Sequence, residues 1–214
     1  MIAEQIAYFK NRLPAGVRLA AVSKFKPVED LMEAYEAGQR LFAENRPLEF
    51  EDKARRLPDD IEWHFIGHLQ TNKVKNVVPY AAMIQSIDSE HLLKAVNDYA
   101  AKIGKVQDIL LEVFVASETT KQGFSAEEAV DVASRIRDFH NVRLRGVMAM
   151  ATFTDDMDQV RREFTNAAAI GARVAAAAGI GKPELSMGMT SDYEVAVECG
   201  STIVRIGTAI FGAR

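Results

Sequence analysis

A lysine stands at the end of the first short apolar run in the chain. Residues 18–24 read RLAAVSK, and alternation along an extended strand puts Ala20, Val22 and Lys24 on one face. Small apolar neighbours keep water away from a lysine, which disfavours the ammonium form and leaves a nucleophilic amine. A neutral amine is the group that forms a Schiff base with an aldehyde. Lys24 is therefore a candidate for covalent chemistry, whereas Lys26 begins the next segment and is expected to be solvated.

Two stretches rich in glycine and hydroxyl groups are candidates for binding an anion. The first, SMGMTSD, covers residues 186–192, and Ser191 with Glu194 three positions later predicts a capping box that opens a helix. In the second, RIGTA, Gly207 allows a ligand to approach the backbone and Thr208 adds a hydroxyl. Backbone N–H groups, hydroxyls and a helix N-terminus suit phosphate, although turn and capping roles alone would explain either stretch.

An arginine lies in the second of these stretches. Arg205 shares an alternating face with Ile203 and Gly207. If that face is interior, the guanidinium needs a partner, because an unpaired buried charge is costly. An acidic neighbour would be a structural partner. The functional alternative is a planar donor that faces a nitrogen of a bound heterocycle.

The strands that must position these groups are visible as short runs rich in Val, Ile, Leu and Phe. They are predicted at residues 18–24, 40–44, 62–69, 83–88, 108–115, 143–150, 184–189 and 202–210. Helical spacing separates them, with helices predicted at residues 28–38, 89–104 and 125–139 and in the alanine-rich stretch 167–181. The caps of the second and third helices are Ser89 and Ser125, the latter in a capping box with Glu128.

Eight strands that alternate with helices predict a closed (β/α)8 barrel, with an open doubly wound sheet as the alternative. The amphipathic segment 2–12 is a spare helix, expected to cover the gap beside the last strand, where no eighth outer helix can follow. In a barrel, functional groups lie at the C-terminal ends of the strands, and phosphate often binds beside strands seven and eight. Lys24 and both anion-binding candidates fall at these places.

Composition is that of an ordinary globular protein. The 214 residues are 48% hydrophobic and 26% charged, and we expect one domain over residues 1–214. Lys and Arg number 26 against 30 Asp and Glu, a net charge of −4 that argues against nucleic acid or a membrane surface as a partner. The single Cys199 and four scattered histidines exclude a disulfide framework and argue against a metal site. Without a secretory signal or a membrane-spanning run, we expect a cytoplasmic protein.

Several stretches together resemble the YggS/PROSC family of pyridoxal phosphate homeostasis proteins, whose barrel is similar to the N-terminal domain of alanine racemase. The resemblance covers nearly the whole chain and is most specific in ELSMGMTSDYEVAV (184–197) and GSTIVRIGTAIFGAR (200–214). Shorter matching stretches are AVSKFKP (21–27), FAENR (42–46), WHFIGHLQTNKVK (63–75), SIDS (86–89) and LRGVMAM (144–150). The resemblance implies a single fold-type III TIM barrel with an added N-terminal helix and no C-terminal β domain.

The resemblance implies pyridoxal 5′-phosphate as cofactor and assigns residues to it. Lys24 would hold the cofactor covalently as a Schiff base, Arg205 would face its pyridine nitrogen, and Asn45 would lie in the pocket. The positions that match phosphate-binding residues are Ser186, Gly207 and Thr208. Because arginine keeps its proton, it would leave the pyridine nitrogen unprotonated, which weakens the ring as an electron sink.

The sequence departs from the family pattern beside Asn45. The usual Gly-Glu-Asn is here Ala43-Glu44-Asn45, and the usual aliphatic-Gln pair is Pro47-Leu48. Pro47 suits the first turn of a helix, but the loss of the glutamine leaves the surroundings of Asn45 open.

Three further family-typical residues have two interpretations each. His64 and Lys73 would line the pocket, or they would be a hydrogen-bonded structural histidine and a solvated lysine. Lys121, two residues before Gly123, fits a family feature or is a surface lysine.

Two functions compete on this basis. We favour a non-catalytic carrier that holds pyridoxal phosphate reversibly and supplies apo-enzymes, and we expect it to be a monomer. The alternative is an amino-acid racemase or related pyridoxal enzyme, which needs a proton-transfer group on the face opposite the lysine. In alanine racemase that group comes from a C-terminal domain, which we do not expect after Arg214. A Schiff-base aldolase would use the same lysine but would not explain Arg205.

Overall fold

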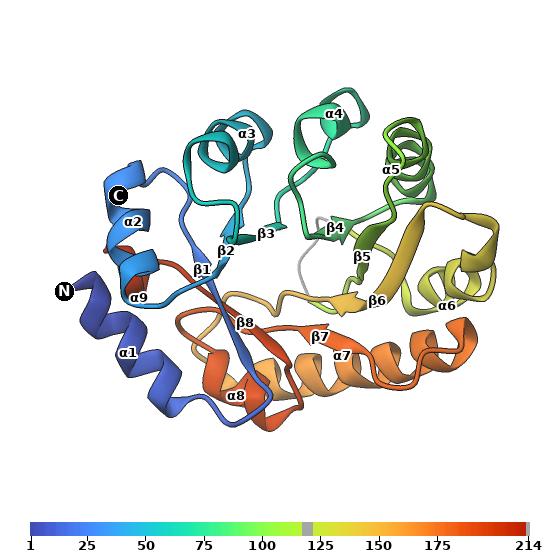
Figure 1. The fold of residues 1–214 in the computed structure, drawn as a ribbon. Helices are drawn as coiled ribbons and strands as arrows, with labels where there is room; N and C mark the ends of the chain where they lie inside the picture. Colours follow the sequence, from blue (N-terminus) through green and yellow to red (C-terminus); the bar gives the residue numbers. More distant parts are fainter. Residues whose placement is uncertain (117–121, 213–214) are drawn as a thin grey trace.

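The computed structural model of the chain is a closed barrel of eight parallel strands in chain order (Figure 1). It describes residues 1–116 and 122–212. The strands are β1 (Arg18–Val22), β2 (Leu41–Glu44), β3 (Glu62–Phe65), β4 (Met83–Ile87), β5 (Gln107–Glu112), β6 (Val142–Met148), β7 (Glu184–Ser186) and β8 (Ile203–Ile206). The predicted (β/α)8 barrel is confirmed, and the open sheet is wrong because β1 pairs with both β2 and β8.

Every strand begins within one residue of its predicted position, and most end earlier than predicted. The largest differences are in β3, predicted to reach residue 69 but ending at Phe65, and in β8, predicted to reach residue 210 but ending at Ile206. In most strands the predicted apolar run extends beyond the last paired residue and into the loop that follows the strand. Strand pairing therefore stops where the loops of the barrel mouth begin.

The helices form the outer layer. They are α1 (Ile2–Arg12), α2 (Val28–Glu36), α3 (Pro47–Arg56), α4 (Val74–Val77), α5 (Glu90–Lys102), α6 (Ala126–Ser134), α7 (Met157–Ala178), α8 (Tyr193–Glu198) and α9 (Thr208–Phe211), with short 3-10 turns η1 (Thr71–Lys73) and η2 (Ile136–Asp138). Both predicted serine caps are confirmed: Ser89 accepts from the Leu92 amide, and Ser125 forms its capping box with Glu128. The helix predicted to reach residue 139 ends at Ser134 and continues as η2.

Helix α1 covers the gap in the outer layer, as predicted. It packs against α2 and α9, and Figure 1 shows it along the outside of the barrel below α2. The Phe9 ring lies 5.5 Å from the Tyr193 ring of α8 in an edge contact, and Arg12 forms an ion pair with Glu194 at 3.3 Å. The four-residue α9 is the single helix that follows β8 within the described residues.

Two separate apolar layers result from the alternation of side chains along the strands. Ala21 and Phe42 face outward into the larger core under the helices, whereas Ala20, Val22 and Met83 belong to a small cluster inside the barrel. Lys24 continues the inward-facing alternation of β1, as predicted.

The barrel interior also contains polar side chains. His64, Gln85, Ser186 and Arg205 are all at most 4% exposed. Buried polar groups of this kind require hydrogen-bond partners, which restrict their orientation.

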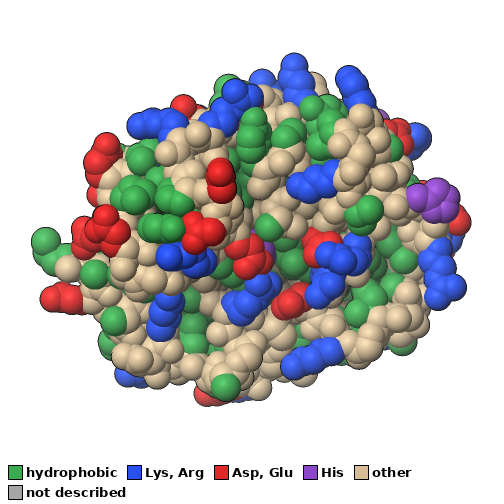
Figure 2. All heavy atoms as spheres, viewed as in Figure 1, with side chains coloured by type: hydrophobic (Ala, Val, Ile, Leu, Met, Phe, Trp, Pro, Cys, Tyr) green, Lys and Arg blue, Asp and Glu red, His purple; other side chains and the backbone are tan. Residues whose placement is uncertain are grey.

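Within the described ranges, no helix is long and apolar enough to cross a bilayer. Basic and acidic side chains are interspersed over the face drawn in Figure 2.

Candidate functional site

A pocket of about 490 Å³ opens at the C-terminal ends of the barrel strands. This volume is in the range of small-molecule sites. Five of the six predicted binding residues line it: Lys24, Asn45, Arg205, Gly207 and Thr208. The barrel therefore brings together residues that lie up to 184 positions apart in the sequence, from Lys24 to Thr208.

A strained turn after β1 positions Lys24. Phe25 has a φ of 63°, in the left-handed region that costs a non-glycine residue about 1 kcal/mol or more. Its amide donates to Glu49 Oε1 at 2.6 Å, and the Arg46 guanidinium lies 5.1 Å from the centre of its ring. These contacts stabilise the turn and fix the direction in which the backbone leaves Lys24.

A buried ionic cluster contacts Ser23, the residue that precedes Lys24 in this turn. It consists of Lys53, Glu44 and Glu49, and we call it the Lys53 cluster. Lys53 Nζ donates to Glu44 Oε1 at 2.6 Å, to Glu49 Oε1 at 2.7 Å and to the Ser23 carbonyl at 2.7 Å. The Ser23 hydroxyl donates to the same Glu44 oxygen at 2.7 Å. Burial raises the pKa of Glu44, while Lys53 and Ser23 lower it. The cluster ties α3 to the residue that precedes Lys24.

Neutral acceptors hold the guanidinium of Arg205. Nη1 donates to the Ser186 carbonyl at 2.7 Å and to the Ser186 hydroxyl at 2.8 Å, and Nη2 donates to the Ala149 carbonyl at 3.0 Å. Burial lowers the pKa of Arg205 to about 10, against the opposite influence of Asp192 and Glu112. Arg205 is thus still charged at neutral pH. No carboxylate forms a direct ion pair with it in residues 1–116 and 122–212, and the acidic neighbours Asp192 and Glu112 act on it only at longer range. One Nη2–H and the Nε–H are not used by these three bonds.

The exit loops of β7 and β8 supply hydroxyl groups from Thr190, Ser191 and Thr208 to the pocket. The amides of Thr190 and Ser191 donate to no acceptor within the described part of the chain. The predicted Ser191 capping box is wrong: α8 begins after Asp192, whose carboxylate accepts from the Met189 amide at 2.6 Å. The turn is therefore held by Asp192, which leaves Ser191 at the pocket.

Ser186 does not lie in the pocket lining. It is fully buried, and its hydroxyl donates to Gln85 Oε1 at 2.6 Å. The oxygen of this Ser186 hydroxyl also accepts a hydrogen bond from Arg205. The phosphate role predicted for Ser186 does not agree with this geometry, because the hydroxyl is already engaged below the strand end. Thr190 and Ser191, four and five residues further along, take its place in the proposal below.

Asn45 presents an unused acceptor at the pocket. Its Oδ1 is buried without a hydrogen-bond partner among the described residues. The loop after β3 closes over it at Gly67, where an added Cβ would lie 2.1 Å from the Asn45 carbonyl oxygen. Leu48, in place of the family's glutamine, is 60% exposed and supplies no donor. Pro47 begins α3, as predicted.

His64 is fully buried inside the barrel, hydrogen-bonded to Gln85 and Glu62, which confirms the interpretation of a structural histidine. Lys26 lines the pocket, although it was expected to be solvated. Lys121 lies outside the described residues.

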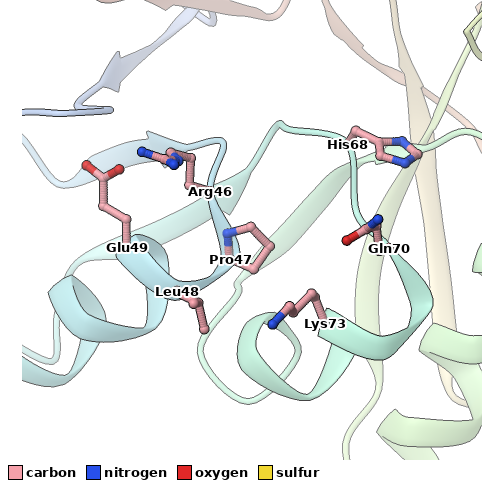
Figure 3. A pocket seen from close by; sticks show the side chains of 7 residues that line it. All are labelled: Arg46, Pro47, Leu48, Glu49, His68, Gln70 and Lys73. Carbon is pink, nitrogen blue, oxygen red and sulfur yellow. The ribbon is translucent and has the colours of Figure 1, made fainter.

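Lys73 lines a second pocket, of about 480 Å³, that shares no lining residue with the first. Figure 3 shows its wall, made by Arg46, Pro47, Leu48 and Glu49 from the start of α3 and by His68, Gln70 and Lys73 from the segment after β3. No group of three or more His, Cys, Asp or Glu side chains in the described ranges could hold a metal ion.

Sequence reasoning missed the Lys53 cluster, and it placed Thr190 and Ser191 in a candidate anion-binding stretch without assigning either residue a binding role. The four-residue spacing of Glu49 and Lys53 was a visible signal of a helix-surface pair. Its contact with Ser23 depends on how α3 packs against β1, which no local spacing reveals.

Comparison with known proteins agrees with this architecture. The profile of the family described as "Alanine racemase, N-terminal domain" matches residues 1–214. The pyridoxal phosphate homeostasis protein of Pasteurella multocida is 39% identical over 208 residues, which cover 95% of this chain and 89% of that protein. That of Escherichia coli is 35% identical, with 95% and 88% covered.

Solved structures give the same result. PipY of Synechococcus elongatus with PLP bound has a TM-score of 0.90 at 33% identity and covers 99% of this chain and 100% of its own. Alanine racemase from Bartonella henselae has a TM-score of 0.76 at 14% identity, which shows the shared fold, and this chain covers 58% of it. The chain belongs to the alanine racemase N-terminal domain family and, within it, to the pyridoxal phosphate homeostasis proteins.

Proposed function

We propose that this protein binds pyridoxal 5′-phosphate in the barrel-mouth pocket and acts in its homeostasis. The observation that carries the proposal is the convergence of three chemically distinct groups in that pocket. These groups are the amine of Lys24, the guanidinium of Arg205 and the hydroxyls beside β7 and β8. They match the aldehyde, the pyridine nitrogen and the phosphate of this cofactor. The unpartnered Asn45 oxygen adds an acceptor for a polar group of the ligand.

Lys24 is the residue that would hold the cofactor covalently. Its amine adds to the aldehyde carbon, a C=N bond forms and the carbonyl oxygen leaves as water. Hydrolysis reverses the step without an oxidant or a reductant. A reversible bond of this kind suits a protein that stores and releases a reactive aldehyde.

Thr190, Ser191, Gly207 and Thr208 would hold the phosphate. Two amides without acceptors and three hydroxyls provide donors for its oxygens. An added Cβ at Gly207 would lie 3.1 Å from the Val22 carbonyl oxygen, so the residue also allows β8 to approach β1 closely.

Arg205 limits the electron-withdrawing power of a pyridine ring bound in the pocket. At neutral pH it remains protonated and can only donate, so a pyridine nitrogen that faces it acts as an acceptor. An unprotonated pyridine is a poor electron sink for carbanions, which is the chemistry that racemisation needs. We propose that a monomer of this chain transfers the cofactor to apo-enzymes that use it.

Titration with two probes tests the proposal. Pyridoxal phosphate should bind stoichiometrically, and pyridoxal, which lacks the phosphate, should bind at least tenfold more weakly. Equal affinity for the two compounds would refute the phosphate site. An amino-acid turnover assay on the loaded protein separates the two functions, because steady racemisation of alanine would favour the enzyme over the carrier.

A further inference from the structure

A chain of hydrogen bonds runs through the barrel interior from Arg205 to the opposite end. Arg205 Nη1 donates to the Ser186 hydroxyl at 2.8 Å, and this hydroxyl donates to Gln85 Oε1 at 2.6 Å. Gln85 Nε2 lies 2.7 Å from His64 Nδ1, and His64 Nε2 lies 3.0 Å from Glu62 Oε1. We call these five residues the interior chain. Four of them lie on four different strands of the barrel, and Glu62 shares β3 with His64.

One arrangement of protons satisfies every member of the interior chain. The hydrogen bond from His64, together with Arg18, lowers the pKa of Glu62 to about 2, so this carboxylate accepts. Burial lowers the pKa of His64, which keeps the ring neutral with its hydrogen on Nε2. Nδ1 then accepts from the Gln85 amide nitrogen. This directs the Gln85 oxygen to the Ser186 hydroxyl, whose oxygen accepts from Arg205.

The end of the interior chain away from the pocket is anchored. Glu62 Oε1 also accepts from Arg18 Nη1 at 2.8 Å, and Arg18 Nη2 lies 3.7 Å from Glu184 Oε1. Glu184 in turn accepts from the Thr202 hydroxyl at 2.5 Å. These groups fix Glu62 at the N-terminal end of the barrel.

The middle of the interior chain cannot rearrange around solvent. His64, Gln85 and Ser186 are at most 1% exposed, so water does not replace a lost partner. Reversal of the Gln85 amide would place its NH2 group toward Ser186 and would remove the donor that His64 Nδ1 needs. The carboxylate of Glu62 therefore determines the orientation of the His64 ring, the Gln85 amide and the Ser186 hydroxyl, whose oxygen accepts from Arg205.

We propose that Glu62, His64 and Gln85 are positioning residues for the cofactor, acting through Ser186 on Arg205. The bonds to Ser186 and Ala149 occupy one edge of the guanidinium and leave the Nε–H and one Nη2–H for a ligand. A fixed orientation of Arg205 fixes where these hydrogens meet a pyridine nitrogen. The inference rests on the proposed function, because a heterocycle in the pocket is the ligand that Arg205 would orient.

The proton arrangement is tested on the protein without ligand. In protein labelled with ¹⁵N-histidine at pH 7.5, the His64 ring should be neutral, with hydrogen on Nε2 and a bare Nδ1. Gln85→Leu should leave the Nε2 hydrogen in place and move the Nδ1 resonance, because it removes the donor to Nδ1. A charged ring, or hydrogen on Nδ1, would overturn the interior chain.

The positioning role is tested with pyridoxal phosphate that carries ¹⁵N in the ring. Gln85→Leu should shift the pyridine nitrogen resonance and raise the dissociation constant at least tenfold. Met83→Ala is the matched control, since Met83 points into the same barrel from the same strand outside the interior chain. It should weaken binding less than twofold and leave the resonance unchanged. If Gln85→Leu does not fold, Ser186→Ala replaces it, because Arg205 then keeps its bond to the Ser186 carbonyl.

The outcomes separate this inference from the proposed function. If the wild type binds pyridoxal phosphate and the variants in the interior chain leave both the resonance and the affinity unchanged, the positioning role is wrong while the proposed function stands. If Met83→Ala moves the resonance as much as Gln85→Leu, the effect is general packing and the inference is again overturned. If the wild type does not bind the cofactor, both fail.

Discussion

Replacement of Lys53 by methionine should destabilise the protein strongly, because it breaks a buried ion cluster rather than removing a surface charge. Lys53 is 4% exposed, and its ammonium group donates three hydrogen bonds of 2.6 to 2.7 Å. Its loss leaves Glu44, which is fully buried, without its counter-charge. Removal of one partner of a buried pair costs about 3–5 kcal/mol. We expect a loss of this size in the free energy of unfolding at pH 8.

The pH dependence of this loss has a defined sign. Burial raises the pKa of Glu44 in the folded state above its unfolded value, and Lys53 opposes that rise. In Lys53→Met the pKa rises further, so the folded variant takes up a proton that the unfolded chain does not. The penalty is complete above the folded pKa and decreases as the pH falls toward the unfolded value of about 4.5. The variant should therefore be closest to wild type in acid.

Urea unfolding followed by circular dichroism at pH 5, 6.5 and 8 measures this loss. Lys94→Met is the matched control: Lys94 pairs with Asp98 four residues later at 2.7 Å, like Lys53 with Glu49, but its side chain is 68% exposed. It should change stability little at any pH. The reasoning is refuted if Lys53→Met costs less than about 1 kcal/mol, or if its cost grows on acidification.

Three other substitutions test separate parts of the structure. Thr208→Val should weaken pyridoxal phosphate binding by about tenfold to a hundredfold and leave pyridoxal binding unchanged, since one charge-assisted hydrogen bond is worth about 1.5–3 kcal/mol; equal losses for both probes would contradict a phosphate role. Gly67→Ala should lower the free energy of unfolding by about 1–3 kcal/mol, because its Cβ would lie 2.1 Å from the Asn45 carbonyl oxygen; an unchanged melting temperature would contradict this close approach. Burial raises the pKa of Glu112 to about 7, so the charged form is disfavoured in the folded state. Glu112→Gln should therefore stabilise the protein by about 3 kcal/mol at pH 8 and by about 1 kcal/mol or less at pH 5, and urea midpoints that move equally at both values would exclude this cause.

The sequence was sufficient for the architecture and for the position of the lysine. Alternation of apolar runs with helical segments predicted a closed barrel, and the parity of Ala20, Val22 and Lys24 predicted an inward-facing amine. The first depends on apolar runs and helical spacing, and the second depends on the period of two along a strand; both are local properties of the sequence.

The sequence did not predict how far along the barrel axis each inward-facing residue lies. Ser186 and Thr190 have the same parity, but Ser186 pairs with Ile203 inside the barrel, whereas Thr190 lies past the strand end and reaches the pocket. The alternation of side chains along β7 cannot distinguish the two residues, because it does not show where the hydrogen-bonded pairing of the strand stops. Contacts between distant elements, such as Lys53 with Ser23 or Gln85 with His64, are set by packing.

Lys24 is expected to form a reversible covalent bond with pyridoxal phosphate. This bond is tested most directly by incubation with the cofactor, reduction with borohydride, digestion and mass measurement of the peptides. A single pyridoxyl-phosphate adduct on Lys24 is predicted, absent in Lys24→Arg and retained in Lys26→Arg, which alters the other lysine of the pocket lining. An adduct on Lys26 or spread over surface lysines, or none at saturating cofactor, would contradict the account.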